Sequence, residues 1–335
     1  MVAGSGREFS GLASLIMVAA TACANRPVRL VVVNTSVAET VSLLGDTLYA
    51  PRFDPATGPE RVRKVTEARE LLSRDVTDLE SRLRLARATT EMGRFREAIA
   101  LYNGIAEIHF RDPRVYRERG EVLLRLRHLD HAIADFHRAG LLLIGRNVIL
   151  EAESSTEGRA SGAAAAQFPL STVQFRTNYF LGISHYLKGA YAAAYPALAE
   201  AARVAQTTDD VARAMLWLFL AARRIGDGGE GGNVLGLVKP DWAEQSEVAE
   251  LILLLAFKGL VPTDSIRAWA LARRDEESAL YSYGVAYSLM LRPERRVDSE
   301  LWLERAHSGG NWAALPYLAA EADLARLRGV NTVIR

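Results

Sequence analysis

The sequence has few of the residues that build covalent or metal-stabilised frameworks. Its 335 residues include one cysteine, Cys23, so neither a disulfide nor a cysteine-based metal site can form within one chain. The formal net charge is +1, which gives no bulk electrostatic attraction to nucleic acid or anionic lipid. Strand and helix patterns do not alternate, which excludes the common nucleotide-binding folds. Hydrophobic residues make up 49% and charged residues 24% of the chain, which is typical of a folded soluble protein.

Residues 1–24 have the pattern of an export signal. Arg7 precedes an uncharged run from Phe9 to Asn25, in which an apolar stretch is followed by small residues, the order typical of secreted proteins. A transmembrane anchor is the alternative, but 17 uncharged residues rich in alanine and glycine are marginal for spanning a bilayer. We therefore expect an exported protein, periplasmic or lipid-anchored in the envelope of a Gram-negative bacterium.

Two processing sites fit this signal. Ala22-Cys23-Ala24 matches a cleavage motif that would be cut before Asn25. Ala20-Thr21-Ala22-Cys23 resembles a bacterial lipobox, which would make Cys23 the lipidated first residue, although Ala20 stands where a larger aliphatic residue is usual. Lipidation is favoured because a lone cysteine otherwise has little reason to be there, and removal of Cys23 stays open.

A repeat with a period of 34 residues follows the signal. A fixed period of this length indicates stacked helix pairs, because one pair cannot bury its apolar face alone. We therefore predict an all-α fold, a superhelix of antiparallel helix pairs over residues 59–206, with looser helical repeats and a cap over 207–335. The pairs that carry the period are Phe95 and Leu129, Ala98 and Ala132, Ile99 and Ile133, Tyr102 and Phe136, and Ile105 and Ala139.

Three units of the repeat are clear. The first spans Leu79–Asp112, the second Pro113–Arg146, and the third begins near Phe175. An excess of 28 residues separates the second and third units and falls within an insertion at 145–172. Insertions of this kind form loops of a solenoid, often on its binding side, so we predict a surface loop or a loop with one short helix.

The segment before the array, residues 25–58, is predicted to be an extended lead-in packed on the array. It contains a β-prone run at Leu30–Val33 and a proline-rich stretch at Ala50–Pro59. Pro59 followed by Glu60 is a favourable helix start.

Small residues recur where the helices of one unit are expected to touch. A large side chain at such a position would force the helices apart, at a cost of about 1–3 kcal/mol. These structural positions are Ala98, Gly120, Ala132, Gly182 and Ala194, and Gly93 belongs to the turn Gly93-Arg94-Phe95 of the first unit.

The pattern beyond Asp210 stays helical but is less regular. Tyr283-Gly284 matches a first helix, and Leu303 with Ala306 matches its partner helix. Trp312–Leu327, rich in alanine, is predicted to be the capping helix. The glycine-rich run Gly226–Gly232 is predicted to be a flexible loop, because it follows a helix and carries two carboxylates that would repel a phosphate.

At Leu79–Arg146 and Phe175–Val204 the chain resembles the tetratricopeptide repeat (TPR) family. The order of signal, repeats and a Leu216-Trp217-Leu218 helix is similar to that of bacterial TPR lipoproteins of the NlpI type. The segments at Tyr283-Gly284-Val285 and Trp312–Ala322 resemble a closer group of exported TPR proteins without a defined role. The resemblance implies an adaptor that binds another protein.

In this family the concave groove is lined by fixed positions of each first helix. Arginines beside tyrosines at these positions suit an extended peptide with carboxylates and an apolar anchor. Arg87 and Glu121 stand where the carboxylate clamp of chaperone-binding members needs asparagine. A solvated charged face is the alternative. The predicted partner groove comprises Arg87, Arg114, Arg117, Arg125, Arg176, Tyr179 and Tyr186.

Other candidate chemistry is weaker. His128, His131 and His137 have no carboxylate at matching spacing, so we expect no metal site. Ser184 and His185 are adjacent on one helix and point in different directions, which is no catalytic triad. A small-molecule pocket between Trp217, Trp242 and Trp269 remains an alternative, although tryptophans are usually core residues.

These observations predict a non-enzymatic scaffold or adaptor of the cell envelope, without cofactor or metal. It would bind an unidentified protein or peptide in its concave groove and no nucleic acid, and it would contact membrane only through a lipid at Cys23. The alternatives are a small-molecule-binding helical protein and a regulatory subunit of a cell-wall hydrolase complex. The sequence leaves the oligomeric state open.

Overall fold

The computed structural model describes residues 37–51, 57–151, 171–226, 228–308 and 310–330. The predicted export signal with Cys23, the Leu30–Val33 run and residues 152–170 of the insertion lie outside this part of the chain.

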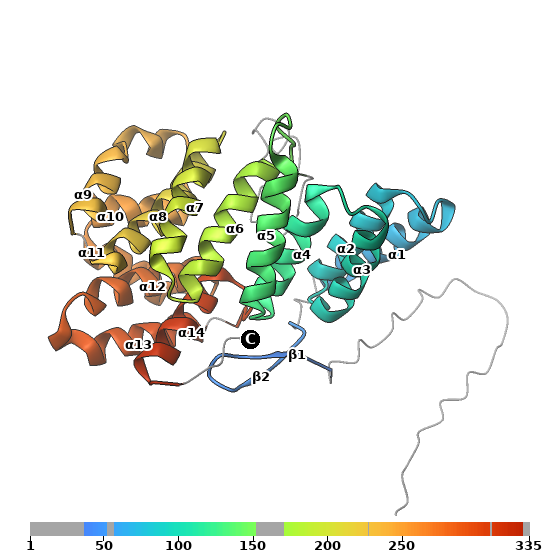
Figure 1. Cartoon of the computed structure of the whole chain (residues 1–335). Helices are drawn as coiled ribbons and strands as arrows, with labels where there is room; N and C mark the ends of the chain where they lie inside the picture. The colour runs from blue at the N-terminus through green and yellow to red at the C-terminus, as the bar shows by residue number, and fades with distance from the viewer. Residues whose placement is uncertain (1–36, 52–56, 152–170, 227, 309, 331–335) are drawn as a thin grey trace, which may run out of the picture. The chain divides into compact units, whose positions relative to one another are not determined.

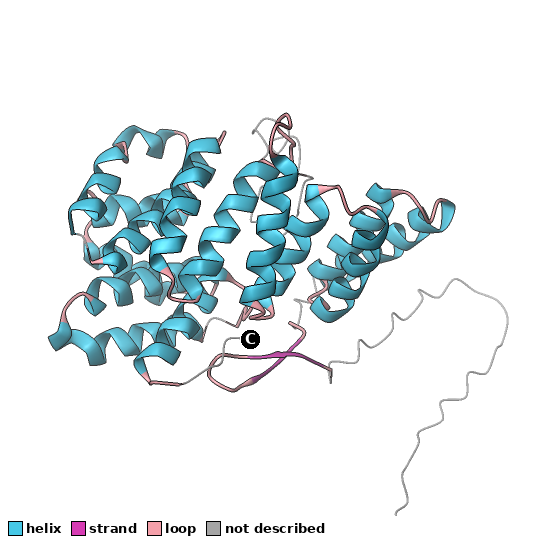
Figure 2. Ribbon diagram, in the orientation of Figure 1, coloured by secondary structure: helices cyan, strands magenta, loops and turns pink. Residues whose placement is uncertain are grey.

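The described residues form an all-α structure with one short β-hairpin (Figures 1 and 2). Consecutive helices pack as neighbours from α1 to α9 and again from α10 to α14, which confirms the predicted superhelix of helix pairs. The helices are α1 Gly58–Arg74, α2 Leu79–Glu91, α3 Phe95–Ile108, α4 Pro113–Arg125, α5 Leu129–Leu143, α6 Val173–Leu187, α7 Tyr191–Val204, α8 Thr208–Ile225, α9 Gly228–Leu237, α10 Ala249–Phe257, α11 Thr263–Ala272, α12 Glu276–Met290, α13 Arg296–His307 and α14 Leu315–Leu327, with 3-10 turns at Pro240–Glu244 and Pro293–Arg295.

The first helices of the regular pairs, α2, α4 and α6, begin at side-chain caps. The Asp78 carboxylate accepts a hydrogen bond from the backbone N–H of Ser81 at 2.7 Å. Asp112 and Thr172 cap α4 and α6 in the same way. Such caps satisfy backbone donors that have no partner inside the helix, and they fix where each pair starts.

The turns inside these pairs repeat one backbone conformation. The φ angle is +66° at Gly93, +65° at Arg127 and +79° at Gly189. Arg127 follows Gly93 by one 34-residue period, so it occupies the glycine position of the second unit. A side chain is strained in this conformation, by about 1–2 kcal/mol, and Arg127 is the only non-glycine residue with positive φ in the described part. Its ion pair, described below, offsets this strain.

Two glycines of the first helices lie against the second helix of the same pair. A Cβ atom at Gly120 would lie 2.8 Å from the Phe136 ring, and one at Gly182 would lie 2.5 Å from Leu198 Cγ. Both distances are too short for real atoms, so only glycine allows these helices to approach so closely. The matching alanines, Ala98, Ala132 and Ala194, are fully buried, and Gly93 lies against Pro51 of the lead-in.

The C-terminal pair α12–α13 has a different contact from the one predicted. A Cβ at Gly284 would lie 2.6 Å from Leu253 of α10, so this glycine faces the preceding helix and not α13. Leu303 and Ala306 of α13 are fully buried nonetheless. Helix α12 packs against α10, α11, α13 and α14, and Gly284 lies on the side of α12 that faces α10.

Helix α14 is a core helix, which corrects its prediction as a cap. A cap would present one polar face to water, yet all ten residues from Pro316 to Ala325 are buried. It packs against α6, α12 and α13, and Figure 1 shows it beneath the central helices. Residues Trp312–Ala314 precede this helix as a turn.

The glycine-rich segment is also not the predicted loop. Helix α8 ends at Gly226, where φ is +98°, and α9 starts two residues later. A Cβ at Gly231 would lie 2.4 Å from Arg223 Cδ. The glycines therefore let α9 lie close to α8, which propensity along the chain does not reveal.

The described lead-in forms an antiparallel hairpin of β1 (Ala38–Val41) and β2 (Thr47–Tyr49). The Thr40 hydroxyl donates to the Leu126 carbonyl at 2.8 Å, and the Leu43 N–H donates to Glu321 Oε1 at 2.6 Å. The Trp312 indole N–H donates to the Tyr49 carbonyl at 2.7 Å. The hairpin thus joins the turn after α4 to the C-terminal segment.

Candidate binding surfaces

The five arginines predicted to line the groove belong to one ion-pair network on α2, α4 and α6. Among the described residues, five carboxylates pair with these arginines in this first-helix network, so their formal charges cancel. Because every one of these arginines already contacts a carboxylate, an acidic partner would have to replace an internal group. The pairs are Arg87 with Glu80 and Glu118, Arg114 with Glu80 and Asp112, Arg117 with Glu118, Glu121 and Glu151, and Arg125 and Arg176 with Glu121.

One end of the first-helix network is buried and the other is open. The side chains of Arg117 and Glu118 are 6% and 4% exposed, whereas that of Glu80 is 47% exposed. Burial alone would raise the pKa of Glu121, but Arg176, Arg125 and Arg117 hold it well below its usual range. Glu121 is therefore ionised, and its ion pairs with Arg117 and Arg125 of α4 and Arg176 of α6 link these two helices.

The two tyrosines predicted for the groove lie in the core, which corrects their placement on an exposed surface. Tyr186 is fully buried, and its hydroxyl lies 2.8 Å from that of Tyr283. Tyr179 is 4% exposed and stacks on Phe175, with ring centroids 5.4 Å apart. Neighbouring side chains cover both rings: Tyr186 packs edge-on against Trp217 of α8, and Tyr179 contacts Phe175 and Phe180 of its own helix.

Glu151 comes from the connection between α5 and α6 and is buried. A single antiparallel bridge, Leu150 to Thr172, brings the two ends of that connection together. Burial raises the pKa of Glu151, and this is opposed by Arg117 and Arg176. The insertion thus supplies a carboxylate to the first-helix face, which is the side of α2, α4 and α6 that carries the first-helix network.

The three turns inside the pairs form the turn edge (residues 92–94, 126–128 and 188–190), where the lead-in and α14 pack, although His128 and Ala190 stay exposed. Arg127 binds Glu321 of α14 through Nε at 3.1 Å and Nη2 at 2.5 Å, and both side chains are at most 4% exposed. Arg127 Nη2 also donates to the Trp312 carbonyl, and the Arg326 guanidinium lies beside Gly189. The lead-in and α14 thus contact all three turns of this edge.

A second buried polar cluster fastens α14 to α6, α8 and α12. Asp323 accepts hydrogen bonds from the Tyr283 hydroxyl at 2.8 Å and from Arg224 Nη2 at 2.6 Å. Arg224 also lies over the rings of Tyr191 and Tyr287, 5.3 and 5.2 Å from their centroids. These contacts satisfy the charges inside the protein, so we regard the cluster as structural.

The opposite ends of the same helices form the loop edge, which carries exposed apolar side chains. Two hydrogen bonds link its three loops: His109 Nε2 lies 3.2 Å from the Thr77 carbonyl, and Arg146 Nη2 donates to the Arg111 carbonyl at 3.1 Å. The exposed side chains are Val76, Ile108, Phe110, Leu141, Ile144, Val148 and Leu150, between 49% and 76% accessible.

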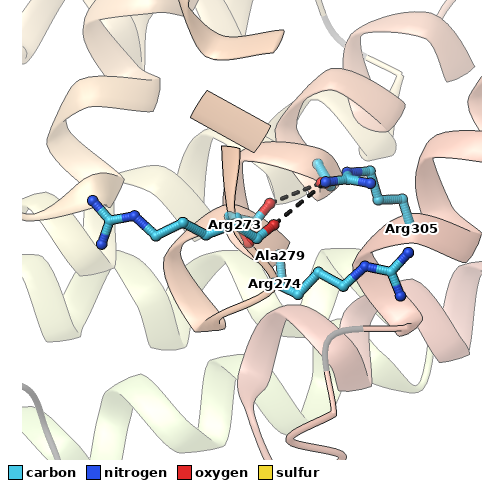
Figure 3. Close-up of a pocket in the computed structure, with 6 residues that line it drawn as sticks. Arg273, Arg274, Ala279 and Arg305 are labelled. Carbon is cyan, nitrogen blue, oxygen red and sulfur yellow. Dashed lines mark hydrogen bonds between the residues drawn. The ribbon is translucent and has the colours of Figure 1, made fainter. Parts of the chain in front are cut away.

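A small pocket between α11, α12 and α13 is lined by Arg273, Arg274 and Arg305 with Ser278, Ala279 and Ser282. Three arginines suggest an anion site, but they do not converge. Arg305 donates to the carbonyls of Ala270 at 2.9 Å and Arg273 at 3.3 Å, and Figure 3 shows the Arg273 side chain extending away from Arg305. The pocket is therefore a packing gap between helices, and Arg305 there links α13 to the end of α11.

The histidines and tryptophans singled out in the sequence are dispersed. His128 faces His131, whereas His137 faces His185, and within the described ranges no three His, Cys, Asp or Glu residues are placed to hold a metal ion. Trp217 is buried against Tyr186 and Tyr283, whereas Trp269 is 43% exposed. None of the helices in the described part is both long and apolar enough to cross a membrane.

No protein-family model matches the chain, and no curated protein sequence is significantly similar to it. Function must therefore be argued from the surfaces above.

Sequence reasoning missed the carboxylates and arginines that close the structure, above all Arg127, Glu321 and Asp323. One signal was available for Arg127: it replaces the glycine of a repeat position where Gly93 and Gly189 need positive φ. No comparable signal marks Glu321 or Asp323, because their partners lie 194 and 99 residues away.

Proposed function

We propose that this protein is a non-enzymatic scaffold of the TPR type, exported to a bacterial cell envelope, which binds another protein at its first-helix face. The arrangement of α2, α4 and α6 supports this proposal: it brings five arginines from three units into one network. Such recurrence of one residue type on one face is typical of repeat proteins that bind extended partners.

The open end of the first-helix network allows this proposal to be tested. Arg114 is 26% exposed and pairs with Glu80 and Asp112, so Arg114→Glu should repel an acidic partner while leaving the buried pair of Arg117 and Glu118 intact. Recovery of crosslinked partner from the envelope should fall at least tenfold at unchanged helical content. Arg63→Glu, an exposed arginine of α1 that pairs with Glu60 and Glu67, is the matched control and should recover the partner normally.

The loop edge is the rival binding surface, because monomeric proteins rarely expose apolar side chains in adjacent groups. If Arg114→Glu recovers the same partner as the native chain, while Ile144→Asp with Val148→Asp does not, the partner binds at the loop edge. Binding at the first-helix face would then be wrong, although the scaffold function would stand.

The cellular address rests on residues 1–24 and needs its own experiment. A clickable fatty acid should label the native protein and not Cys23→Ser. A mature chain that starts at Asn25 without label would indicate a soluble exported protein. Recovery from the cytosol with Met1 still present would contradict export.

A further inference from the structure

The contact between Arg117 and Glu151 is incomplete on both sides. An arginine presents Nε–H and Nη2–H side by side, so that a carboxylate can bind both with its two oxygens. Glu151 contacts Nη2 with Oε2. Arg117 Nε and Glu151 Oε1 are buried, and neither has a hydrogen-bond partner among the described residues.

Other arginines of this protein achieve the two-point geometry. Arg119, on the same helix as Arg117, binds both oxygens of Asp135 at 2.7 Å through Nε and Nη2. Arg127 binds Glu321 in the same way. The fold therefore allows arginines to bind a carboxylate through two hydrogen bonds. The one-point contact is specific to Glu151.

The backbone explains why Glu151 reaches only part of the site. Its position is set by the bridge at the base of the insertion, where the Glu151 N–H donates to the Ser171 carbonyl at 2.9 Å and the Val173 N–H donates to the Ile149 carbonyl at 2.8 Å. Its neighbours Leu150 and Val148 are 56% and 53% exposed. Moving this short strand away would uncover little apolar core, while it would uncover Arg117.

A second arginine, Arg176, lies near the contact between Arg117 and Glu151. Arg176 is 11% exposed on its side chain and pairs with Glu121, and its charge acts on Glu151 together with that of Arg117. A carboxylate entering from the loop side would thus meet two positive groups and one unfilled donor, in a setting where charge-assisted hydrogen bonds are strong.

We propose that Arg117 and Arg176 form a carboxylate-binding site in which Glu151 is a built-in occupant, and that a carboxylate of the bound protein displaces it. This inference rests on the proposed scaffold function and names the group that the partner contributes. The group is either an acidic side chain or a C-terminal carboxylate, since both present the same two oxygens.

The test measures the affinity of labelled hexapeptides for the full chain by fluorescence anisotropy. One alanine–leucine peptide carries a free C-terminal carboxylate, a second carries one internal glutamate and an amidated end, and a third has no carboxylate. Glu151→Gln should bind one of the acidic peptides at least tenfold more tightly than the native chain does, because the occupant loses its charge. Which acidic peptide gains identifies the source of the carboxylate.

Two variants make the result specific. Adding Arg117→Gln to Glu151→Gln should abolish the gain. Asp135→Asn releases Arg119 on the other side of the same helix, and it should give no gain; an equal gain would mean that any released arginine binds the peptides and would overturn the site. No gain for either acidic peptide in Glu151→Gln would also overturn it, whereas partner recovery at the first-helix face would still support the scaffold.

The native chain provides a second measurement that does not depend on the folding of a variant. A saturating amount of the tighter acidic peptide should increase deuterium uptake at the amides of Glu151 and Val173, because the bridge opens when Glu151 leaves. Uptake in α12 should stay the same. Binding with unchanged uptake at both amides would show that the peptide binds elsewhere and would contradict the displacement.

Discussion

The two edges of the regular helix pairs differ in what covers them. At the turn edge, the lead-in and α14 contact all three turns: Pro51 lies against Gly93, Arg326 lies beside Gly189, and the second turn is held by the buried Arg127–Glu321 pair and by side-chain hydrogen bonds to backbone carbonyls. At the loop edge, seven large apolar side chains remain exposed. Helix pairs alone leave both edges open, so the difference arises from segments outside the repeats.

The comparison shows that the ends of this chain complete its core. Glu321 contacts the lead-in at Leu43 and the second unit at Arg127, so one carboxylate connects three parts of the chain. A buried ion pair adds little net stability over apolar packing, but breaking one is costly because it leaves a buried charge. The turn edge should therefore respond strongly to single substitutions, and the loop edge weakly.

The largest expected effect is at Glu321. Glu321→Ala leaves Arg127 buried, charged and in a strained backbone conformation, and it should lower the free energy of unfolding by about 3–5 kcal/mol. Urea unfolding followed by circular dichroism measures this change. The control is Glu304→Ala, whose exposed pair with Arg328 should be worth at most about 1 kcal/mol. Similar losses in both variants would contradict the packing of α14 on the turn edge through Arg127.

Two glycine-to-alanine substitutions in the helices between the two edges should change the stability of the protein in opposite directions. Gly120→Ala places a Cβ 2.8 Å from the Phe136 ring and should destabilise by about 1–3 kcal/mol. Gly140→Ala, in α5 with no atom within 4 Å of the added group, should stabilise by about 0.5–1 kcal/mol through helix propensity. Thermal unfolding of the two variants measures both shifts, and equal shifts would show that α4 and α5 do not touch at Gly120.

Acid should loosen the turn edge before the loop edge. Burial lowers the pKa of His307, which lies beside Glu321, and that of His185 in the last turn of α6. The unfolded chain therefore binds protons at these sites more readily than the folded one, so stability is greatest above about pH 6.5 and falls as the pH drops below that value. His307→Gln should reduce this dependence. Hydrogen exchange that rises first in the loop edge on acidification would contradict this assignment.

The smallest expected effect on stability is at the loop edge. Ile144→Ser with Val148→Ser removes side chains that are 76% and 53% exposed, and each should change the free energy of unfolding by at most about 0.5 kcal/mol. Leu43→Ser in the hairpin, where the side chain is 8% exposed, is the matched change at the turn edge and should cost clearly more. A larger loss for the loop-edge pair would mean that the apolar strip is covered within the protein.

Much of the fold could be predicted from the sequence because its signals are local. The 34-residue period and the small residues at Gly120 and Gly182 depend on contacts within a pair, and such contacts recur at fixed spacing. The burial of Ala98, Ala132 and Ala194 follows the same rule. The cap assignment of Trp312–Leu327 failed, since an alanine-rich helix has the same pattern whether it ends an array or fills its centre.

The candidate site was predictable only in part. Repeat positions identified the five arginines, yet their carboxylate partners decide what those arginines can bind. Glu118 and Glu121 lie on the same helix as Arg117 and are visible in the sequence, but Glu151 reaches the network from the far side of an insertion boundary. Tyr186 has the register of a groove residue, and only the packing of Trp217 from α8 and Tyr283 from α12 places it in the core.

The sequence by itself determined that this protein is a stack of helix pairs, because hydrophobic periodicity and helix caps act over a few turns of chain. Only the tertiary structure decided which edge of the stack the lead-in and α14 pack against. This packing depends on Glu321 meeting Arg127 and Asp323 meeting Arg224 across 194 and 99 residues. Pairing over such separations follows from how the helices pack in three dimensions, and no spacing along the chain encodes it.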